Sequence, residues 1–265
     1  MALIEMTFAA DTLQRWTDVT VILPVENAGV PNVVKPEVFP TLYLLHGFSG
    51  NSKDWLTYSN IRLWAEQYNM AVVMPSGENG FYVDNNGAEI RGGKFIKELV
   101  EYTRKVFPLS TRRDQTFIGG LSMGGFGALR NGLVYSEIFG KIVALSGAYI
   151  VDDIAGKKEG YFDGMAGYGY YSRVFGNLDT LKESKNNPLV CAAEAVREER
   201  VPEIFMACGT EDFVIEKNRN MRDALKALGI PINYYEEEGN HDWIFWNKWL
   251  LKALEWIVQM ENKME

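Results

Sequence analysis

Short hydrophobic runs alternate with longer stretches of helical period along most of this 265-residue chain. The alternation predicts an α/β fold, a mostly parallel sheet with helices on both faces, because parallel strands need a crossover helix between them. The expected strands are TDVTVILPV, TLYLLHG, MAVVMPS, QTFIGG, GKIVALSG, EIFMACG and INYYEEE. IEMTF precedes the first of these with no helix between, so the two are expected to pair antiparallel at one edge.

Several intervening stretches carry clear helix signals. The apolar residues of 92–107 fall on one face of a helix, and a proline follows as a stop. The set from Met221 to Leu228 keeps the same spacing and is closed by glycine and proline. The last helix is expected in WIFWNKWLLKALEWIV, where Trp249 and Trp256 have the spacing of residues that pack on the sheet.

Composition limits the classes of protein that fit this chain. Hydrophobic residues make up 47% of the sequence, enough for one large core, so residues 1–265 are expected to form one domain. No run approaches the roughly 18 apolar residues of a membrane span, and MALIEMTFAA lacks a signal-peptide pattern, so we expect a cytoplasmic protein without membrane contact. A net charge of −8 without a lysine or arginine cluster argues against nucleic acid as a partner.

The cysteines and histidines do not form the pattern of a cofactor or metal site. Cys191 and Cys208 are too few for a disulfide framework, which fits a reducing compartment. Cysteine and histidine are nowhere clustered with ligand spacing. We therefore expect neither a metal nor an organic cofactor.

One segment breaks the alternation of strands and helices. Residues 148–187 are rich in glycine and tyrosine and show little periodicity. A long irregular segment inside a compact domain is more often a binding loop than a connector. The sequence therefore predicts a lid-like insertion here.

The stretch GGLSMGG places one hydroxyl, that of Ser122, among glycines between a predicted strand and a predicted helix. Gly120 to Gly124 match the pattern G-x-S-x-G, in which a sharp turn exposes the serine oxygen at the carboxyl edge of a sheet. Such a serine is a candidate nucleophile. The alternative is an ordinary strand-to-helix turn in which the serine caps the helix.

A serine nucleophile needs a base, and the chain has two histidines, His46 and His241. In this architecture the histidine follows the serine and the acid along the chain, which selects His241. The acid is expected in a loop at the same sheet edge, where FMACGTEDF supplies Glu211 and Asp212 directly after a strand. Asp242 is adjacent to the histidine and poorly placed to orient it.

Acyl transfer also needs donors for the developing oxyanion. The backbone N–H of Met123, directly after the serine, is one candidate. The second is expected from the loop after an earlier strand, HGFSG, where the N–H of Phe48 is placed to donate. His46 at the start of that loop then has a structural role.

Six stretches together resemble one family: LYLLHGFSGN, VVMPSGENGFYVD, TFIGGLSMGGFGALR, ALSGAY, CGTEDF and GNHDWIFWNKWL. Their order and spacing resemble the esterase group of the α/β-hydrolase superfamily that includes esterase D, bacterial tributyrin esterases and feruloyl or acetyl-xylan esterases. The resemblance spans nearly the whole chain. It implies an α/β-hydrolase fold, a triad of Ser122, Asp212 and His241, and a serine carboxylesterase acting on small short-chain or aromatic acyl esters.

The resemblance leaves other functions open. The same group contains S-formylglutathione hydrolases, so a thioesterase is an alternative, and mycolyl transferases. A third alternative is a hydrolase-like fold kept as a non-catalytic binding module.

Aromatic residues cluster at positions suited to the rim of a pocket. The candidates for substrate contact are Trp55, Phe81, Tyr82, Asp84 and Trp243. The alternative for each aromatic residue is a place in the core. The aromatic excess also permits a homo-oligomer.

Overall fold

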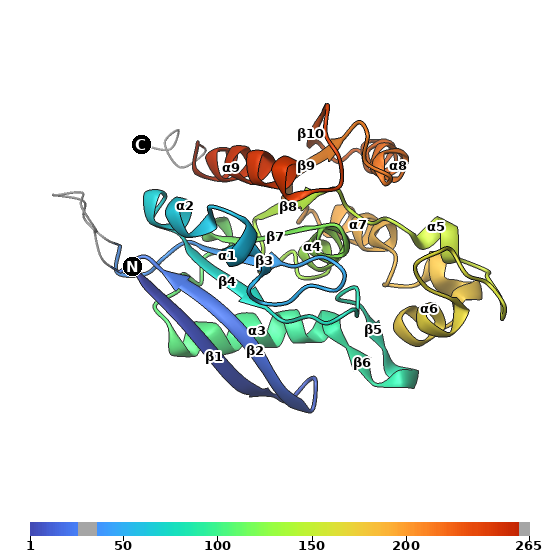
Figure 1. The fold of residues 1–265 in the computed structure, drawn as a ribbon, viewed down its shortest axis with the longest axis horizontal. Helices are drawn as coiled ribbons and strands as arrows, with labels where there is room; N and C mark the ends of the chain where they lie inside the picture. Colours follow the sequence, from blue (N-terminus) through green and yellow to red (C-terminus); the bar gives the residue numbers. More distant parts are fainter. Residues whose placement is uncertain (26–35, 260–265) are drawn as a thin grey trace.

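The computed structural model describes residues 1–25 and 36–259, and its centre is an eight-stranded sheet (Figure 1). The strands are, in sheet order, β1 (Ala2–Ala10), β2 (Arg15–Leu23), β4 (Ala71–Pro75), β3 (Thr41–Leu45), β7 (Thr116–Leu121), β8 (Lys141–Leu145), β9 (Glu203–Gly209) and β10 (Ile232–Glu237). β2 pairs antiparallel with both β1 and β4, and the other neighbours are parallel. The predicted α/β class, the mostly parallel sheet and its antiparallel edge are confirmed.

Helices cover both faces of the sheet (Figure 1). They are α1 (Asp54–Tyr58), α2 (Ile61–Gln67), α3 (Gly92–Val106), α4 (Met123–Val134), α5 (Val151–Ile154), α6 (Tyr168–Phe175), α7 (Pro188–Arg197), α8 (Ile215–Ala227) and α9 (Trp243–Gln259). A short hairpin of β5 (Asp84–Asn85) and β6 (Ile90–Arg91) lies outside the main sheet. Within the described ranges, no helix combines the length and the apolar character of a membrane span.

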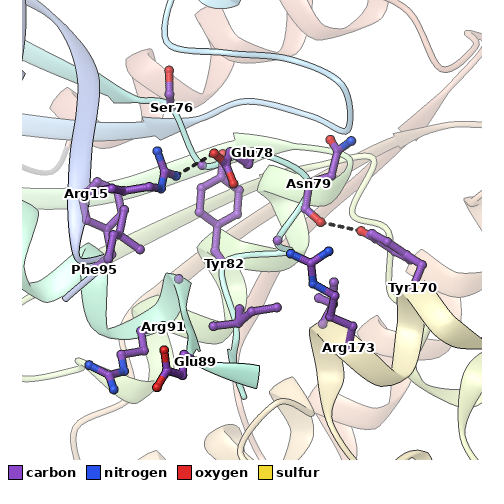
Figure 2. Close-up of a pocket in the computed structure, with 16 residues that line it drawn as sticks. Arg15, Ser76, Glu78, Asn79, Tyr82, Glu89, Arg91, Phe95, Tyr170 and Arg173 are labelled. Atoms are coloured by element: carbon purple, nitrogen blue, oxygen red, sulfur yellow. Dashed lines mark hydrogen bonds and ion pairs between the residues drawn. The ribbon is translucent and has the colours of Figure 1, made fainter. Parts of the chain in front are cut away.

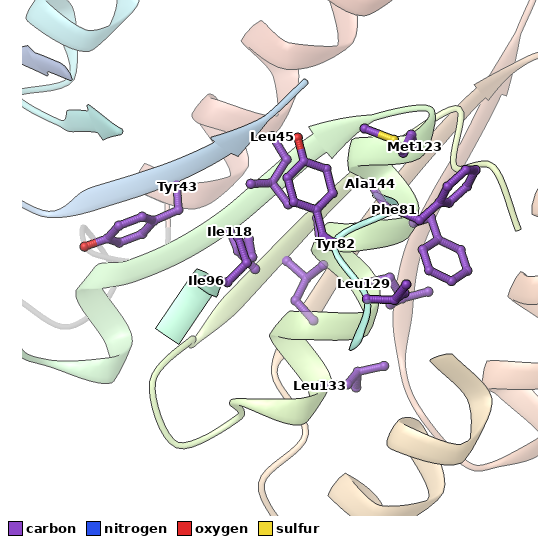
Figure 3. Packing of buried hydrophobic residues seen from close by; sticks show 14 of the residues in the cluster. Tyr43, Leu45, Phe81, Tyr82, Ile96, Ile118, Met123, Leu129, Leu133 and Ala144 are labelled. Carbon is purple, nitrogen blue, oxygen red and sulfur yellow. The ribbon is translucent and has the colours of Figure 1, made fainter. Parts of the chain in front are cut away.

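Alternating side chains of the strands fill two hydrophobic layers, one on each face of the sheet. In β3, Leu42 and Leu44 pack in the layer of α2 and α9, whereas Tyr43 and Leu45 pack in the layer of α3, α4, α7 and α8. Figure 3 shows part of the second layer, in which Ile118 of β7 lies between the sheet and the helices. This sandwich holds the carboxyl ends of the parallel strands at a common edge.

The last helix packs on the sheet through the two tryptophans that the sequence singled out. The ring of Phe205 in β9 lies 6.1 Å from that of Trp249 and 5.5 Å from that of Trp256, measured between centroids. Lys141 of β8 donates to the carbonyl of Ile257 at 2.8 Å, which satisfies one of the carbonyls near the end of α9. The predicted packing of these tryptophans is confirmed.

The segment 148–187 is more regular than its sequence suggests. It contains α5, α6 and a 3₁₀ helix, Leu178–Glu183. α5 has only four residues and α6 eight, so neither is long enough to give a clear hydrophobic period. The prediction of an irregular segment was therefore wrong for these helices, while its role as a lid stays a prediction.

Candidate active site

Ser122 occupies a sharp turn between β7 and α4. Its backbone has φ 53° and ψ −118°, a region that residues with a side chain rarely adopt. The turn is fixed because the N–H of Ser122 donates to the carbonyl of Leu145 at 2.9 Å, and its carbonyl accepts from Phe126 and Ala148, each at 3.0 Å. The side chain makes no helix-capping hydrogen bond, so the structure does not support the capping alternative.

The two glycines of the pattern have a steric role. A Cβ atom on Gly120 would lie 2.4 Å from the carbonyl oxygen of Gly124. A Cβ atom on Gly124 would lie 2.4 Å from the carbonyl oxygen of Leu45 and 2.6 Å from that of His46. Backbone atoms leave no room for a side chain on either side of the serine, which explains the spacing of the glycines.

Three side chains from separate loops meet at this turn. The Nε2 atom of His241 lies 2.9 Å from the Oγ atom of Ser122. The Nδ1 atom of the same ring lies 2.9 Å from both carboxylate oxygens of Asp212. Asp212 follows β9 and His241 follows β10, which are parallel neighbours and deliver their loops to the same edge of the sheet.

Neither of the other two carboxylates considered from the sequence reaches the imidazole in this way. Glu211 accepts from the hydroxyl of Thr210 at 2.7 Å and from the backbone N–H of Gly239. Asp242 accepts from the backbone N–H groups of Ile244 and Phe245, each at 3.0 Å, at the start of α9. The structure therefore brings together the three residues that the family resemblance implied.

The carboxylate of Asp212 is enclosed and surrounded by donors. Its side chain is 0% exposed, and it accepts from the N–H of Val214 at 3.0 Å. The hydroxyl of Ser146 is a further hydrogen-bond partner. Burial by itself would raise the pKa of Asp212, but the hydrogen bonds from His241, Val214 and Ser146 outweigh it and hold the pKa below its ordinary value.

Trp246 sets the direction of the hydrogen bond from Ser146. Its indole Nε1–H donates to the Oγ atom of Ser146 at 3.0 Å, and an indole can only donate. The hydroxyl proton of Ser146 is therefore available to Asp212, whose ionised carboxylate can only accept. The ring of Trp246 also packs edge-on against His241, 4.9 Å between centroids. Neither role could be read from the sequence, because nothing local to Ser146 marks it as a neighbour of a carboxylate.

The two predicted oxyanion donors lie beside the serine. Met123 is the first residue of α4, so its N–H has no acceptor within the helix. Phe48 lies in a turn closed by a hydrogen bond of 3.2 Å from the N–H of Gly50 to the carbonyl of Gly47. Phe48, Met123 and Ser122 line one cavity. Their placement is compatible with donation to one oxygen atom, and that function stays a prediction.

His46 fixes the turn that carries Phe48. Its Nδ1 atom lies 2.7 Å from the carbonyl of Gly47, and its Nε2 atom accepts from the N–H of Gly77 at 2.8 Å. These contacts require a neutral ring that carries its proton on Nδ1. Burial lowers the pKa of His46 and so favours this form, although the Gly47 carbonyl opposes the shift. The structural role expected for His46 agrees with this arrangement.

The cavity at Ser122 has a volume of about 800 Å³. Aromatic and aliphatic side chains, among them Phe81, Tyr171 and Phe213, line it together with charged residues from α5 and the segment that follows. Phe213 is 66% exposed and its ring lies 4.4 Å from that of His241, measured between centroids. Of the five predicted substrate contacts, Phe81 alone is among the residues lining this cavity.

Trp55 and Trp243 lie elsewhere. Trp55 is 1% exposed, and its indole N–H donates to the carbonyl of Leu45 at 3.0 Å. Trp243 packs edge-on against Trp55 and Trp246, with centroid distances of 5.0 and 5.3 Å. The structure therefore contradicts substrate contact for Trp55, which is part of the core, and does not place Trp243 in the cavity.

Tyr82 and Asp84 brace the fold beside the cavity. Tyr82 is 1% exposed, and its hydroxyl donates to the carbonyl of His46 at 3.2 Å. Asp84 forms an ion pair of 3.1 Å with the buried guanidinium of Arg130 and accepts from the N–H of Lys94 at 3.0 Å. The expected substrate contacts of Tyr82 and Asp84 are thus replaced by structural ones.

Among residues 1–25 and 36–259, no group of three or more histidine, cysteine, aspartate or glutamate side chains is arranged to hold a metal ion. Cys191 and Cys208 are both buried and free.

The steric role of the glycines gives a stability prediction. Gly124→Ala places a Cβ atom against two backbone carbonyls and is expected to lower the free energy of unfolding by more than about 2 kcal/mol. Gly169→Ala, in α6 with no atom within 4 Å of the new Cβ, is the matched control and is expected to be neutral or slightly stabilising. Chemical unfolding of both variants checks this, and equal stability of the two would contradict the steric argument.

Comparison with known proteins places this geometry in a family. The model of the family described as "Putative esterase" matches residues 11–257. The chain is 44% identical over 266 residues to an acetyl esterase of Caldicellulosiruptor saccharolyticus, covering 99% of this chain and 100% of that protein.

Solved structures agree with the family match. A fluorophosphonate-binding serine hydrolase of Staphylococcus aureus superposes with a TM-score of 0.85 at 27% identity, covering 97% of this chain and 98% of that chain. An S-formylglutathione hydrolase of the same organism superposes with a TM-score of 0.82 at 28% identity and the same coverage. The chain is thus a carboxylic ester hydrolase with the α/β-hydrolase fold, and it belongs to the esterase family whose model it matches.

Proposed function

We propose that the protein is a serine carboxylesterase that hydrolyses esters of short acyl groups, with acetyl esters as the leading candidates, through an acyl-serine intermediate. The observation that carries the proposal is the position of His241, 2.9 Å from the Ser122 hydroxyl on one side and 2.9 Å from Asp212 on the other. This is the arrangement in which an imidazole removes the proton of a serine as it attacks a carbonyl.

In the proposed acylation step, the Oγ atom of Ser122 attacks the ester carbonyl while its proton passes to Nε2 of His241. The N–H groups of Phe48 and Met123 hold the oxyanion that forms. The intermediate collapses, the carbon–oxygen bond to the alcohol breaks, and the alcohol leaves with the proton from His241.

In the deacylation step, water gives a proton to His241 and adds to the acyl carbon. Collapse of the second intermediate returns the proton to Ser122 and releases the acid. Asp212 keeps the proton-bearing nitrogen of the ring, Nδ1, turned away from the serine and stabilises the imidazolium in both steps. No cofactor takes part in this scheme.

The acyl group is assigned from the relative and the cavity together. The relative that is 44% identical over the full chain is an acetyl esterase. Aromatic side chains such as Phe48, Phe81 and Phe213 line the cavity, and its 800 Å³ leave room for a group larger than acetyl on the alcohol or the acyl side. Aromatic acyl groups, feruloyl among them, are therefore the second class to test.

A thioesterase is the alternative, favoured by the similarity to the staphylococcal S-formylglutathione hydrolase. A glutathione thioester carries carboxylates, and Lys157 and Lys217 line the cavity. However, Lys217 is engaged with Asp153 at 2.9 Å, and Asp152 and Asp163 also line the cavity. The carboxylates that line the cavity thus offset its two lysines, so the cavity offers little electrostatic attraction to the carboxylates of a glutathione leaving group.

A ladder of p-nitrophenyl esters from acetyl to octanoyl, with methyl ferulate and S-acetyl and S-formyl glutathione alongside, tests the substrate class. The expected result is the highest kcat/KM for acetyl or propionyl esters and a decline with chain length. A preference of ten-fold or more for glutathione thioesters over the matched oxygen esters would overturn the carboxylesterase assignment.

The triad gives a graded set of kinetic predictions. Ser122→Ala is expected to lower kcat by on the order of a million-fold, because the nucleophile is lost. Asp212→Asn is expected to lower kcat by about ten thousand-fold, because the ring is then held in the wrong tautomer. Glu211→Gln is the matched control and is expected to stay within about two-fold, since Glu211 contacts Thr210 and Gly239 rather than the ring.

Two outcomes would count against this assignment of roles. Retained turnover in purified Ser122→Ala would remove the acyl-serine. A fluorophosphonate probe that fails to add its mass to Ser122 in the intact protein would favour the non-catalytic binding module instead.

Ser146 and Trp246 are expected to act as positioning residues for Asp212. Ser146→Ala removes one donor to the carboxylate of Asp212, which then stabilises the imidazolium more strongly. The protonated, inactive form of the base is therefore favoured, and the acidic limb of the kcat/KM profile shifts to higher pH. Trp246→Phe keeps an aromatic ring and loses only the N–H, and should shift the profile in the same direction by less. Unchanged profiles in both variants, measured from pH 4 to 9, would contradict the role.

A further inference from the structure

A second cavity of about 400 Å³ lies beside the 76–80 loop (Figure 2). Its walls come from the 76–80 loop, the β6 strand, the start of β2 and helix α6. Apolar side chains such as Phe95 and Val174 and the ring of Tyr82 form part of the lining. None of these residues lines the cavity at Ser122. The volume falls within the range of small-molecule sites.

The charged lining of this cavity is positive although the chain carries a net charge of −8. Three arginines line it, Arg15, Arg91 and Arg173, against two glutamates, Glu78 and Glu89, so that the charges leave one positive charge in excess. Arg15 is engaged with Glu78 at 2.9 Å. Over the part of the chain that the structure describes, no carboxylate lies within ion-pair distance of the guanidinium of Arg173.

Arg173 is the guanidinium best placed to receive a ligand. Figure 2 shows it extending from α6 into the space between Tyr82 and Tyr170. An arginine with free donors beside aromatic rings suits a carboxylate attached to an apolar body, because the fork of donors matches two oxygens and the rings cover the rest. One excess positive charge also fits a monoanion better than a phosphate dianion.

The wall of this cavity is hydrogen-bonded to the predicted oxyanion turn. The N–H of Gly77 donates to His46 at 2.8 Å, and the side-chain oxygen of Asn79 accepts from the N–H of Ser49 at 2.7 Å. The hydroxyl of Tyr170 donates to the carbonyl of Asn79. A ligand between the 76–80 loop and α6 therefore contacts the residues that fix the position of Phe48.

The segment that begins in this wall is strained. Glu78 and Tyr82, which line the second cavity, have φ of 48° and 54°, and Phe81, which lines the cavity at Ser122, has φ 50°. Such conformations persist where the surroundings impose them, and they concentrate at ligand sites and switch regions. Small movements of this loop are thus expected to change the oxyanion turn.

From these observations we propose that the second cavity binds a small monocarboxylate with an apolar body, held by Arg173, and that its occupancy alters turnover through the 76–80 loop. Binding of the monocarboxylate does not depend on the proposed function. The change in turnover rests on the proposed esterase activity, because it is measured as ester hydrolysis.

Binding is tested with 4-phenylbutyrate and its uncharged amide as probes, by isothermal titration of the full chain. The acid is expected to bind at one saturable site and the amide at least ten-fold more weakly, because a charge-assisted hydrogen bond is lost. Arg173→Gln is expected to weaken the acid by ten-fold or more. Arg197→Gln, an exposed arginine on α7 that does not line the cavity, is the matched control and should leave binding unchanged.

Turnover of p-nitrophenyl acetate with and without the probe separates the two claims. Occupancy of the second cavity is expected to change kcat by two-fold or more in the original chain and not in Arg173→Gln, whereas competition at Ser122 would raise KM in both. Equal binding of acid and amide, or retained binding in Arg173→Gln, would overturn the site. Binding without any change in kcat would overturn the proposed effect of the second cavity on turnover. A protein that binds the acid but does not hydrolyse esters would support the binding site and overturn the proposed function.

Discussion

The left-handed turn at Ser122 is the constraint on which the site depends. A residue with a side chain holds φ 53° only when its surroundings impose that conformation, and here β8 supplies the acceptor and the segment after β8 a donor. The turn can pack against the β3 carbonyls because Gly120 and Gly124 have no side chains. Its result is a hydroxyl beside the first N–H of α4, which places the candidate nucleophile and a candidate anion-binding group together.

Burial of one charge organises the rest of the site. The carboxylate of Asp212 is removed from water, which would be costly without partners. Its hydrogen bonds to His241, Val214 and Ser146 meet that cost and also fix the imidazole relative to the serine. The same contacts therefore stabilise the charge of Asp212 and fix the orientation of the His241 ring. Trp246 joins them from α9, so the last helix contributes to the site as well as to the core.

Sequence reasoning succeeded where the signal was local and failed where it depended on which way a side chain points. All eight strands of the sheet followed from short apolar runs, and the serine and histidine followed from their places after strands. The place after β9 left Glu211 and Asp212 as candidate acids, and only the family resemblance implied Asp212. The aromatic residues Trp55 and Tyr82 have the same local signature as rim residues, yet both point into the core and donate to buried carbonyls. Within 148–187 the helices were too short to give a period.

The sequence by itself determined the order of the strands, the sharp turn at Ser122 and the histidine that meets the serine there. Hydrophobic periodicity and glycine spacing act within a few residues, so they can be read without coordinates. Tertiary structure decided that Ser146 and Trp246 support the carboxylate, and that Arg173 lines a second cavity beside the 76–80 loop. These contacts join segments about 65 to 100 residues apart, and only the packing of helices on the sheet brings such segments within hydrogen-bond distance.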